Sequence, residues 1–193
     1  MAISTGYKKI KTAVFISGTG SNLFSLVKFS KLSKSPILIN LIISNNPKSK
    51  GLKFAKIFKI KKIIFDFKKN KLDEKKLLKI LKKQDINLIC LAGFMQILSK
   101  NFIKNFKGKI LNIHPSLLPK YKGLDTHKRV IENKEKFTGC TVHYVSTKLD
   151  SGKIIIQKKI KINRNDTPRK LAKKVLTQEH KLYPKAILSI FNL

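Results

Sequence analysis

Short apolar runs alternate along the chain with segments whose apolar residues recur at helical spacing. The apolar runs predict buried strands at residues 12–17, 37–43, 62–67, 87–92 and 110–114. Helices are predicted after the turn at residues 18–22, at 51–58, and over the strongly periodic stretch 73–83. This order is typical of an α/β fold with a largely parallel sheet. Residues 87–92 are almost wholly apolar, so we expect helices to cover both faces of that strand.

The second half of the chain changes character after residue 114. A loop rich in proline and glycine precedes a short predicted helix at 126–132 and two strands at 140–145 and 154–162. In the last strand lysines alternate with isoleucines, which indicates a partly solvated face. A long final helix is expected after Asp166-Thr167-Pro168, where Asp or Thr can cap and Pro suits the first turn. No linker or repeat divides the chain, so we expect one domain over residues 1–193.

The formal charge of +33 is the strongest feature of the composition. Only three of the 43 basic residues are arginine, which leaves 40 lysines (43 minus 3), spread over the polar positions of almost every segment. Phosphate clamping and base recognition favour the planar fork of arginine. A coding bias explains this pattern better than a nucleic-acid surface does, and the expected consequence is a positive field that attracts anionic ligands.

The cysteines and the lengths of the apolar runs indicate the cellular compartment of the protein. Cys90 and Cys140 lie within apolar strands, which is typical of reduced core thiols and not of a secreted, disulfide-linked fold. No apolar run approaches the roughly 18 to 20 residues that a membrane-spanning helix needs. We therefore expect a cytoplasmic protein that does not bind membranes.

The first candidate site is the turn Gly18-Thr19-Gly20-Ser21-Asn22. Between a strand and a helix, its backbone N–H groups and the helix dipole can receive a phosphate. It is not a P-loop, because no Gly-Lys-Ser/Thr follows, and Leu23 stands where the dinucleotide fingerprint needs its third glycine. On its own, the turn fits a structural helix cap equally well.

A second candidate site begins at Asn112 and His114, which share one face of a predicted strand because residues two apart point the same way. An amide can stabilise an oxyanion, and an imidazole can handle protons near neutral pH. Asp150 lies in an ordinary Asp-Ser-Gly turn, and it gains interest only if the fold brings it to His114. The other histidines show no metal-ligand spacing, so no metal is expected.

These pieces occur in a recognisable order. The central segment is Asn112-Ile113-His114-Pro115-Ser116-Leu117-Leu118-Pro119, and further matching stretches are residues 16–23, 91–95, 97–99, 120–121, 149–152, 177–180 and 183–184 with Gly123 and 126–127. Together they span almost the whole chain, and they resemble the folate-dependent glycinamide ribonucleotide formyltransferases.

The resemblance implies a fold, a reaction and a set of site residues. The fold would be Rossmann-like, with three layers and a mostly parallel central sheet, the N-terminal half binding phosphate and the C-terminal half carrying the folate and catalytic loops. The reaction would move a formyl group from 10-formyltetrahydrofolate to the amine of 5-phosphoribosylglycinamide in purine biosynthesis. The implied residues are Asn112, His114 and Asp150 for catalysis, Gly20, Ser21 and Asn22 for the substrate phosphate, Glu179 for the amine end, and Met95, Gln96, Ile97, Leu98 and Asn112 for folate.

The sequence departs from the family pattern at a few positions. Gln96 stands where arginine is common, and Asp125 stands where a histidine often precedes Thr126-His127. The basic residue that contacts folate is open between Lys69 and Lys71. Direct transfer without a covalent enzyme intermediate is the implied mechanism.

Two alternatives remain behind this interpretation. Methionyl-tRNA formyltransferases share the central segment, but they usually carry a further C-terminal domain, and this sequence ends at Leu193. A basic RNA-binding module on the same fold would suit the charge, yet the intact Asn112, His114 and Asp150 oppose it. We expect small-molecule partners, no specific nucleic acid, and either a monomer or a homodimer.

Overall fold

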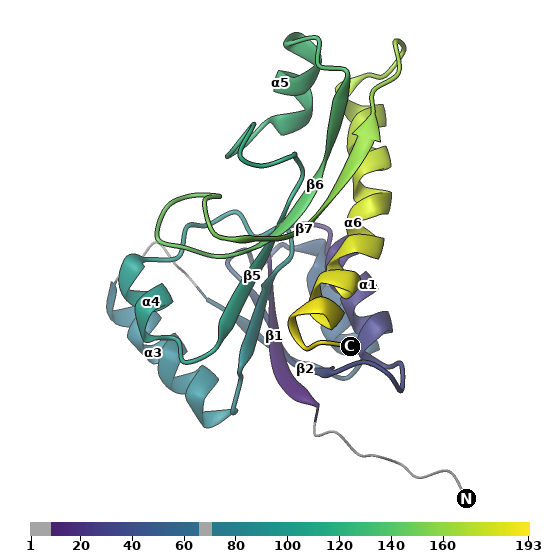
Figure 1. Ribbon diagram of the computed structural model, residues 1–193. Coiled ribbons are helices and arrows are strands. Elements are labelled where there is room, and N and C mark those ends of the chain that lie inside the picture. The colour runs from purple at the N-terminus through teal and green to yellow at the C-terminus, as the bar shows by residue number, and fades with distance from the viewer. Residues whose placement is uncertain (1–8, 66–70) are drawn as a thin grey trace, which may run out of the picture.

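Seven strands form one mixed sheet in the computed structural model, which describes residues 9–65 and 71–193 (Figure 1). The strands are β1 (Ile10–Ile16), β2 (Ile37–Ser44), β3 (Lys61–Ile64), β4 (Leu88–Leu91), β5 (Lys109–His114), β6 (Phe137–Tyr144) and β7 (Ile154–Lys161). Their order is β3-β2-β1-β4-β5-β6-β7. The strands β1 to β5 are parallel to one another, β6 is antiparallel to β5, and β7 is antiparallel to β6. This confirms the expected α/β class with its mostly parallel sheet.

The helices follow the predicted order with one addition. They are α1 (Ser21–Ser30), the 3-10 turn η1 (Lys50–Leu52), α2 (Lys53–Ile57), α3 (Lys71–Lys83), α4 (Lys100–Asn105), α5 (Thr126–Glu132) and α6 (Pro168–Ile190). The predicted helix at 51–58 is divided between η1 and α2, and α4 was not predicted. The end of the predicted strand at 62–67 falls partly on residues 66–67, which lie outside the described residues.

Helices cover both faces of the sheet because its central strands are apolar on both sides. In β1, Ala13 and Phe15 join a core cluster that includes residues of α3 and α4. Val14 and Ile16 join the other cluster, with residues of α1 and α6. Figure 1 shows these two helix pairs on opposite sides of the strands. The expectation that β4 is buried on both faces is confirmed, since all four of its residues are buried and they divide between the two clusters.

Two contacts fix α6 against its neighbours. The Tyr183 hydroxyl lies 3.1 Å from the carbonyl oxygens of both Leu91 and Leu111, at the end of β4 and within β5. Pro184, inside the helix, has no N–H to give to the carbonyl of His180 four residues earlier. The Ser25 hydroxyl of α1 donates to that carbonyl instead, at 2.9 Å. The carbonyl that α6 leaves without a helical partner therefore accepts a hydrogen bond from α1, and this bond holds the two helices side by side.

A crevice for ligands is expected at the carboxyl ends of β1 and β4. These strands are neighbours, but the connections that leave their carboxyl ends use helices on opposite faces of the sheet, α1 and α4. Open α/β sheets bind ligands at such a switch in strand order. The loops after the two strands meet here, where the Ser17 amide donates to the Gly93 carbonyl at 3.0 Å and the Ser17 hydroxyl accepts from the Met95 amide at 2.7 Å.

Candidate active site

The turn between β1 and α1 is built for close backbone approach. Gly20 has φ of 75°, and a Cβ there would lie 2.6 Å from the Cα of Gly51. Only glycine fits both the left-handed conformation and the contact. Gly20 caps α1 without a side-chain hydrogen bond, so the first N–H groups of the ten-residue helix are open to an anion.

Asn22, the last residue of the predicted phosphate turn, reaches across to α6. Its Nδ2 donates to Oε2 of Glu179 at 2.7 Å, and both side chains are buried. The Oδ1 atom of Asn22 is buried without a hydrogen-bond partner. Burial raises the pKa of Glu179 above its ordinary value, although the bond from Asn22 opposes that effect. The fold thus joins two residues that are 157 positions apart, and it leaves one acceptor free beside them.

The second group forms at the end of β5, where Asn112 and His114 share a face as predicted. Asp150, in the loop between β6 and β7, brings its Oδ2 within 3.4 Å of His114 Nδ1 and its Oδ1 within 3.5 Å of Asn112 Nδ2. The Gly123 amide donates to Asp150 Oδ2 at 2.9 Å and holds the carboxylate in place. The structure therefore brings all three predicted catalytic residues together.

The ring of His114 meets acceptors on both sides. Its Nε2 lies 2.8 Å from the carbonyl oxygen of Tyr121, and this oxygen can only accept, so Nε2 carries a proton. Its Nδ1 faces the Asp150 carboxylate. A doubly protonated ring is satisfied at both nitrogens, and the arrangement therefore suits an imidazolium that stabilises negative charge.

Sequence reasoning missed His143, which was treated with the other histidines as lacking metal spacing. It pairs with Asn112 across β5 and β6, and its Nε2 lies 3.2 Å from Asn112 Nδ2. Burial lowers the pKa of His143, against opposing effects of the Tyr144 carbonyl and Asp150 and with a further lowering from His114. Its strand pairing was not visible in the sequence, because the register of β6 on β5 depends on the loop between them.

The stretch predicted to contact folate follows the carboxyl end of β4, next to the loop after β1. Met95 and Ile97 are 62% and 73% exposed, respectively, so both apolar side chains are accessible to a ligand. Leu98 is only 4% exposed and belongs to the core, so only its backbone is left for a ligand. Gln96 is half-buried. Lys69 and the side chain of Lys71 lie outside the described part of the chain.

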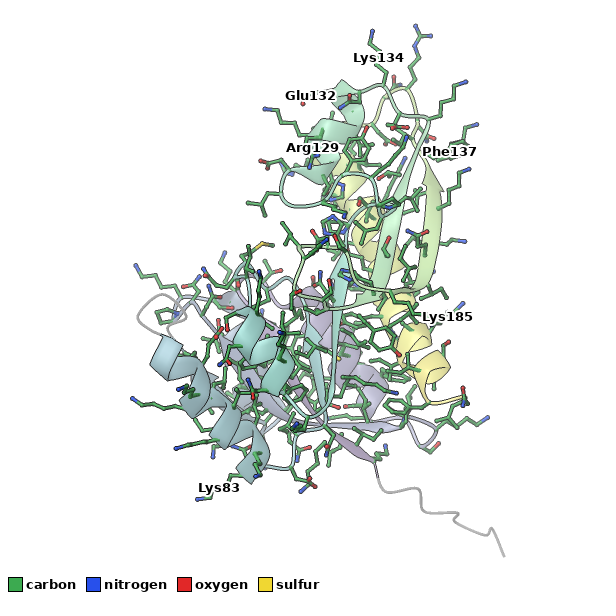
Figure 2. The ribbon with its side chains drawn as sticks, turned by 60° about the vertical axis from the view of Figure 1, so that its left-hand side comes forward. Lys83, Arg129, Glu132, Lys134, Phe137 and Lys185 are labelled. Carbon is green, nitrogen blue, oxygen red and sulfur yellow. The ribbon has the colours of Figure 1, made fainter. Side chains whose placement is uncertain are left out.

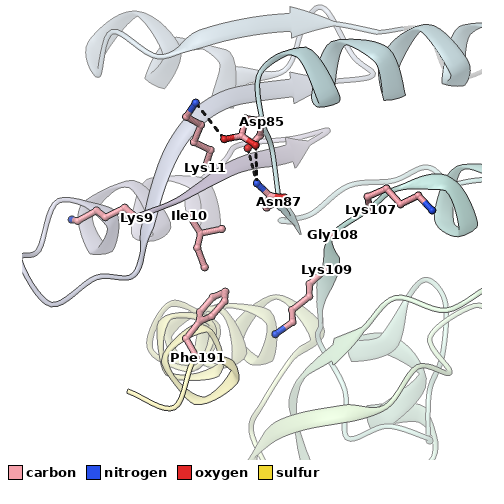
Figure 3. A pocket seen from close by; sticks show the side chains of 9 residues that line it. All are labelled: Lys9, Ile10, Lys11, Asp85, Asn87, Lys107, Gly108, Lys109 and Phe191. Carbon is pink, nitrogen blue, oxygen red and sulfur yellow. Dashed lines mark hydrogen bonds and ion pairs between the residues drawn. The ribbon is translucent and has the colours of Figure 1, made fainter. Parts of the chain in front are cut away.

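A hollow of about 400 Å³ opens at the opposite end of the sheet, near the start of β1, β4 and β5 (Figure 3). Three of its lysines already have partners. Lys9 donates to two carbonyls at the end of α1, Lys11 lies 3.6 Å from Asp85, and Lys109 lies over the ring of Phe191. These contacts hold three of the four lysines that line the hollow against the protein's own groups.

Lysines are also spread widely over the surface. Figure 2 shows Lys83, Lys134 and Lys185 projecting from separate parts of the molecule. Among the described residues, no group of three or more His, Cys, Asp or Glu side chains could hold a metal ion. No helix within the described ranges is long and apolar enough to cross a membrane.

Comparison with known proteins agrees with this geometry. The family described as Formyl transferase matches residues 10–187. The phosphoribosylglycinamide formyltransferase of Haemophilus influenzae is 39% identical over 180 residues, which cover 92% of this chain and 85% of that protein. The solved structure of phosphoribosylglycinamide formyltransferase from Brucella melitensis matches with a TM-score of 0.88 at 38% identity, covering 95% of this chain and 96% of that one.

Longer relatives match over one part of their length. The human trifunctional purine biosynthetic protein adenosine-3 is 40% identical over 183 residues. The match covers 93% of this chain but only 18% of that protein. The family match, the match to the bacterial relative and the match to the solved structure each include nearly all of the described strands and helices. The chain belongs to the formyl transferase family, and within it to the phosphoribosylglycinamide formyltransferases.

Proposed function

We propose that this chain transfers the formyl group of 10-formyltetrahydrofolate to the amine of 5-phosphoribosylglycinamide. The observation that carries the proposal is the convergence of Asn112, His114 and Asp150 at the carboxyl edge of the sheet. An amide donor and an imidazolium can stabilise the oxyanion of a tetrahedral intermediate in acyl transfer, and a buried carboxylate can stabilise the imidazolium. Membership in the formyltransferase family supports the same reaction.

The mechanism we propose is direct transfer. The substrate amine attacks the formyl carbon, and the carbonyl oxygen becomes an oxyanion that Asn112 and the His114 imidazolium stabilise. The Asp150 carboxylate, whose Oδ2 lies 3.4 Å from His114 Nδ1, stabilises the positive charge of the imidazolium. The bond from carbon to the folate nitrogen then breaks, and the proton lost by the amine is relayed through water to that nitrogen.

The phosphoribosyl substrate would lie between the first turn of α1 and α6. The open N–H groups at Gly20, Ser21 and Asn22 suit its phosphate, because a helix N-terminus attracts anions. The unpartnered Oδ1 of Asn22 can accept a hydrogen bond from the substrate. Glu179, bonded to Asn22, would hold the amine end.

The folate would lie along the loop after β4. Met95 and Ile97 offer exposed apolar surface, and the backbone of residues 95–98 offers hydrogen-bonding groups to the pteridine. We further propose that the reaction takes place in the cytoplasm, since Cys90 and Cys140 are buried and unpaired, as expected in a reducing compartment.

Turnover of His114→Ala tests the proposed mechanism. We expect kcat for formyl transfer to fall by about 10² to 10⁴-fold, the usual contribution of a positioned acid or base. The KM values should change little, and urea unfolding should show that the variant is folded. A kcat close to that of the wild type would refute the role of His114.

A further inference from the structure

His143 faces the catalytic amide from the neighbouring strand. It is 2% exposed, and it lies directly opposite Asn112 in the antiparallel pairing of β5 with β6. The pairing of β6 with β7 shifts register at the step from Val142 to His143. Irregularities of this kind re-aim side chains near active sites. The ring is thus held inside the molecule, within reach of the proposed catalytic residues.

The hydrogen bonds fix which nitrogen of His143 carries a proton. Nδ1 lies 2.8 Å from the Tyr144 carbonyl oxygen, which can only accept, so Nδ1 is the protonated nitrogen. The donor Nδ2 of Asn112 lies 3.2 Å from Nε2, nearer than Asp150 Oδ1 at 3.8 Å, which suits Nε2 as an acceptor. Burial lowers the pKa of His143 and favours the same neutral ring. The charged and titratable groups that act on this ring in the described structure are Asp150 and His114.

An acceptor at Nε2 determines how the Asn112 carboxamide is turned. With Nδ2 toward His143, the amide donates to Nε2 at 3.2 Å and faces Asp150 Oδ1 at 3.5 Å. The opposite orientation would place the amide oxygen against two acceptors and lose both contacts. The bond to Asp150 is at the outer limit of length, so the second N–H remains available to another oxygen.

We propose that His143 is a positioning residue, which as a neutral imidazole holds the Asn112 amino group toward the formyl oxygen. The inference rests on the proposed function, because it assigns His143 an effect only through Asn112. Without this acceptor the carboxamide can rotate, and its donor leaves the place where negative charge develops. Misplacement of a catalytic group by about 1 Å can cost on the order of a hundredfold in rate.

Two substitutions separate the acceptor from the rest of the side chain. His143→Asn retains a donor near the Tyr144 carbonyl but has no atom at the Nε2 position. His143→Gln can place its amide oxygen at that position. We expect kcat to fall about ten- to a hundredfold in His143→Asn, with KM for both substrates within about threefold, and to recover to within about threefold of wild type in His143→Gln.

A double-mutant cycle with Asn112→Ala provides the decisive test. If His143 acts through Asn112, adding His143→Asn to Asn112→Ala should lower kcat by less than about twofold. A merely structural effect of His143→Asn would persist in the Asn112→Ala background. If the losses in kcat of the two substitutions were additive, the positioning role of His143 would be wrong, while the proposed function would stand. A wild-type kcat in Asn112→Ala would instead refute the proposed role of Asn112, and the positioning role with it. A wild-type kcat in His143→Asn would overturn the positioning role directly.

Discussion

The carboxylate of Asp150 is the most informative group to neutralise, because it contacts both of the other proposed catalytic residues. Asp150→Asn keeps the size of the side chain. Its backbone φ of 43° is in the left-handed region, which asparagine tolerates as well as aspartate. The carboxamide oxygen can still accept from the Gly123 amide, which now bonds Oδ2 at 2.9 Å. The substitution therefore removes the charge, and it also replaces the oxygen that faces Asn112 Nδ2 at 3.5 Å with an amino group.

The size of the effect follows from the distance between the charges. At 3.4 Å the attraction between Asp150 and a protonated His114 is about 5 kcal/mol for an effective dielectric constant near 20. The remaining hydrogen bond recovers about 1 to 2 kcal/mol of this. A net loss of about 3 to 4 kcal/mol corresponds to a fall in kcat of roughly 10² to 10³-fold.

Steady-state formyl transfer measures this loss, and Asp85→Asn is a matched control. Asp85 also faces a cation, Lys11 at 3.6 Å, but its side chain is 61% exposed at the far end of the sheet. It also has a left-handed backbone, with φ of 57°. We expect the control to keep wild-type kcat. If Asp150→Asn stayed within about threefold of wild type, the electrostatic reasoning would be wrong.

Three further predictions concern groups that are buried or half-buried. Glu179→Gln should raise KM for the phosphoribosyl substrate about tenfold; because burial raises the folded-state pKa of Glu179, the variant should also gain stability over wild type as pH rises above about 4. Ser25→Ala should lower the free energy of unfolding by about 1 to 2 kcal/mol, and by less in a Pro184→Ala background, where the restored N–H serves the same carbonyl. Burial raises the pKa of both Cys90 and Cys140 to about 12, so DTNB at pH 8 should label them only as fast as the protein unfolds.

Each of these has a result that would contradict it. A stability gain of Glu179→Gln that is largest at low pH would reverse the sign expected from a raised pKa. Equal losses for Ser25→Ala in the two backgrounds would show that the hydroxyl does not replace the missing helical bond. Rapid labelling of a native thiol would mean that Cys90 or Cys140 is reached without unfolding.

The elements that the sequence predicts well are those with long apolar periodicity. The stretch 73–83 and the run 87–92 correspond to α3 and β4 because their side chains must be buried on defined faces. The six-residue helix α4 is too short to show a period. Its signal was Ser99, whose hydroxyl accepts from the Phe102 amide as an N-cap.

The site could be predicted only in part, since its contacts join distant segments. That Asn112 and His114 share a face follows from strand geometry alone. The approach of Asp150 depends on the turn after β6, and the pairing of Asn22 with Glu179 depends on how α6 crosses α1. The contact of His143 with Asn112 could not be predicted, because cross-strand register is set by tertiary structure.

The acceptor for the formyl group is the central claim, and one competition assay tests it most directly. The purified protein would be given 10-formyltetrahydrofolate together with 5-phosphoribosylglycinamide and methionyl initiator tRNA, and both products would be quantified. We expect formylated glycinamide ribonucleotide as the product, with tRNA formylation at background. Formylation of the tRNA without turnover of the ribonucleotide would contradict it.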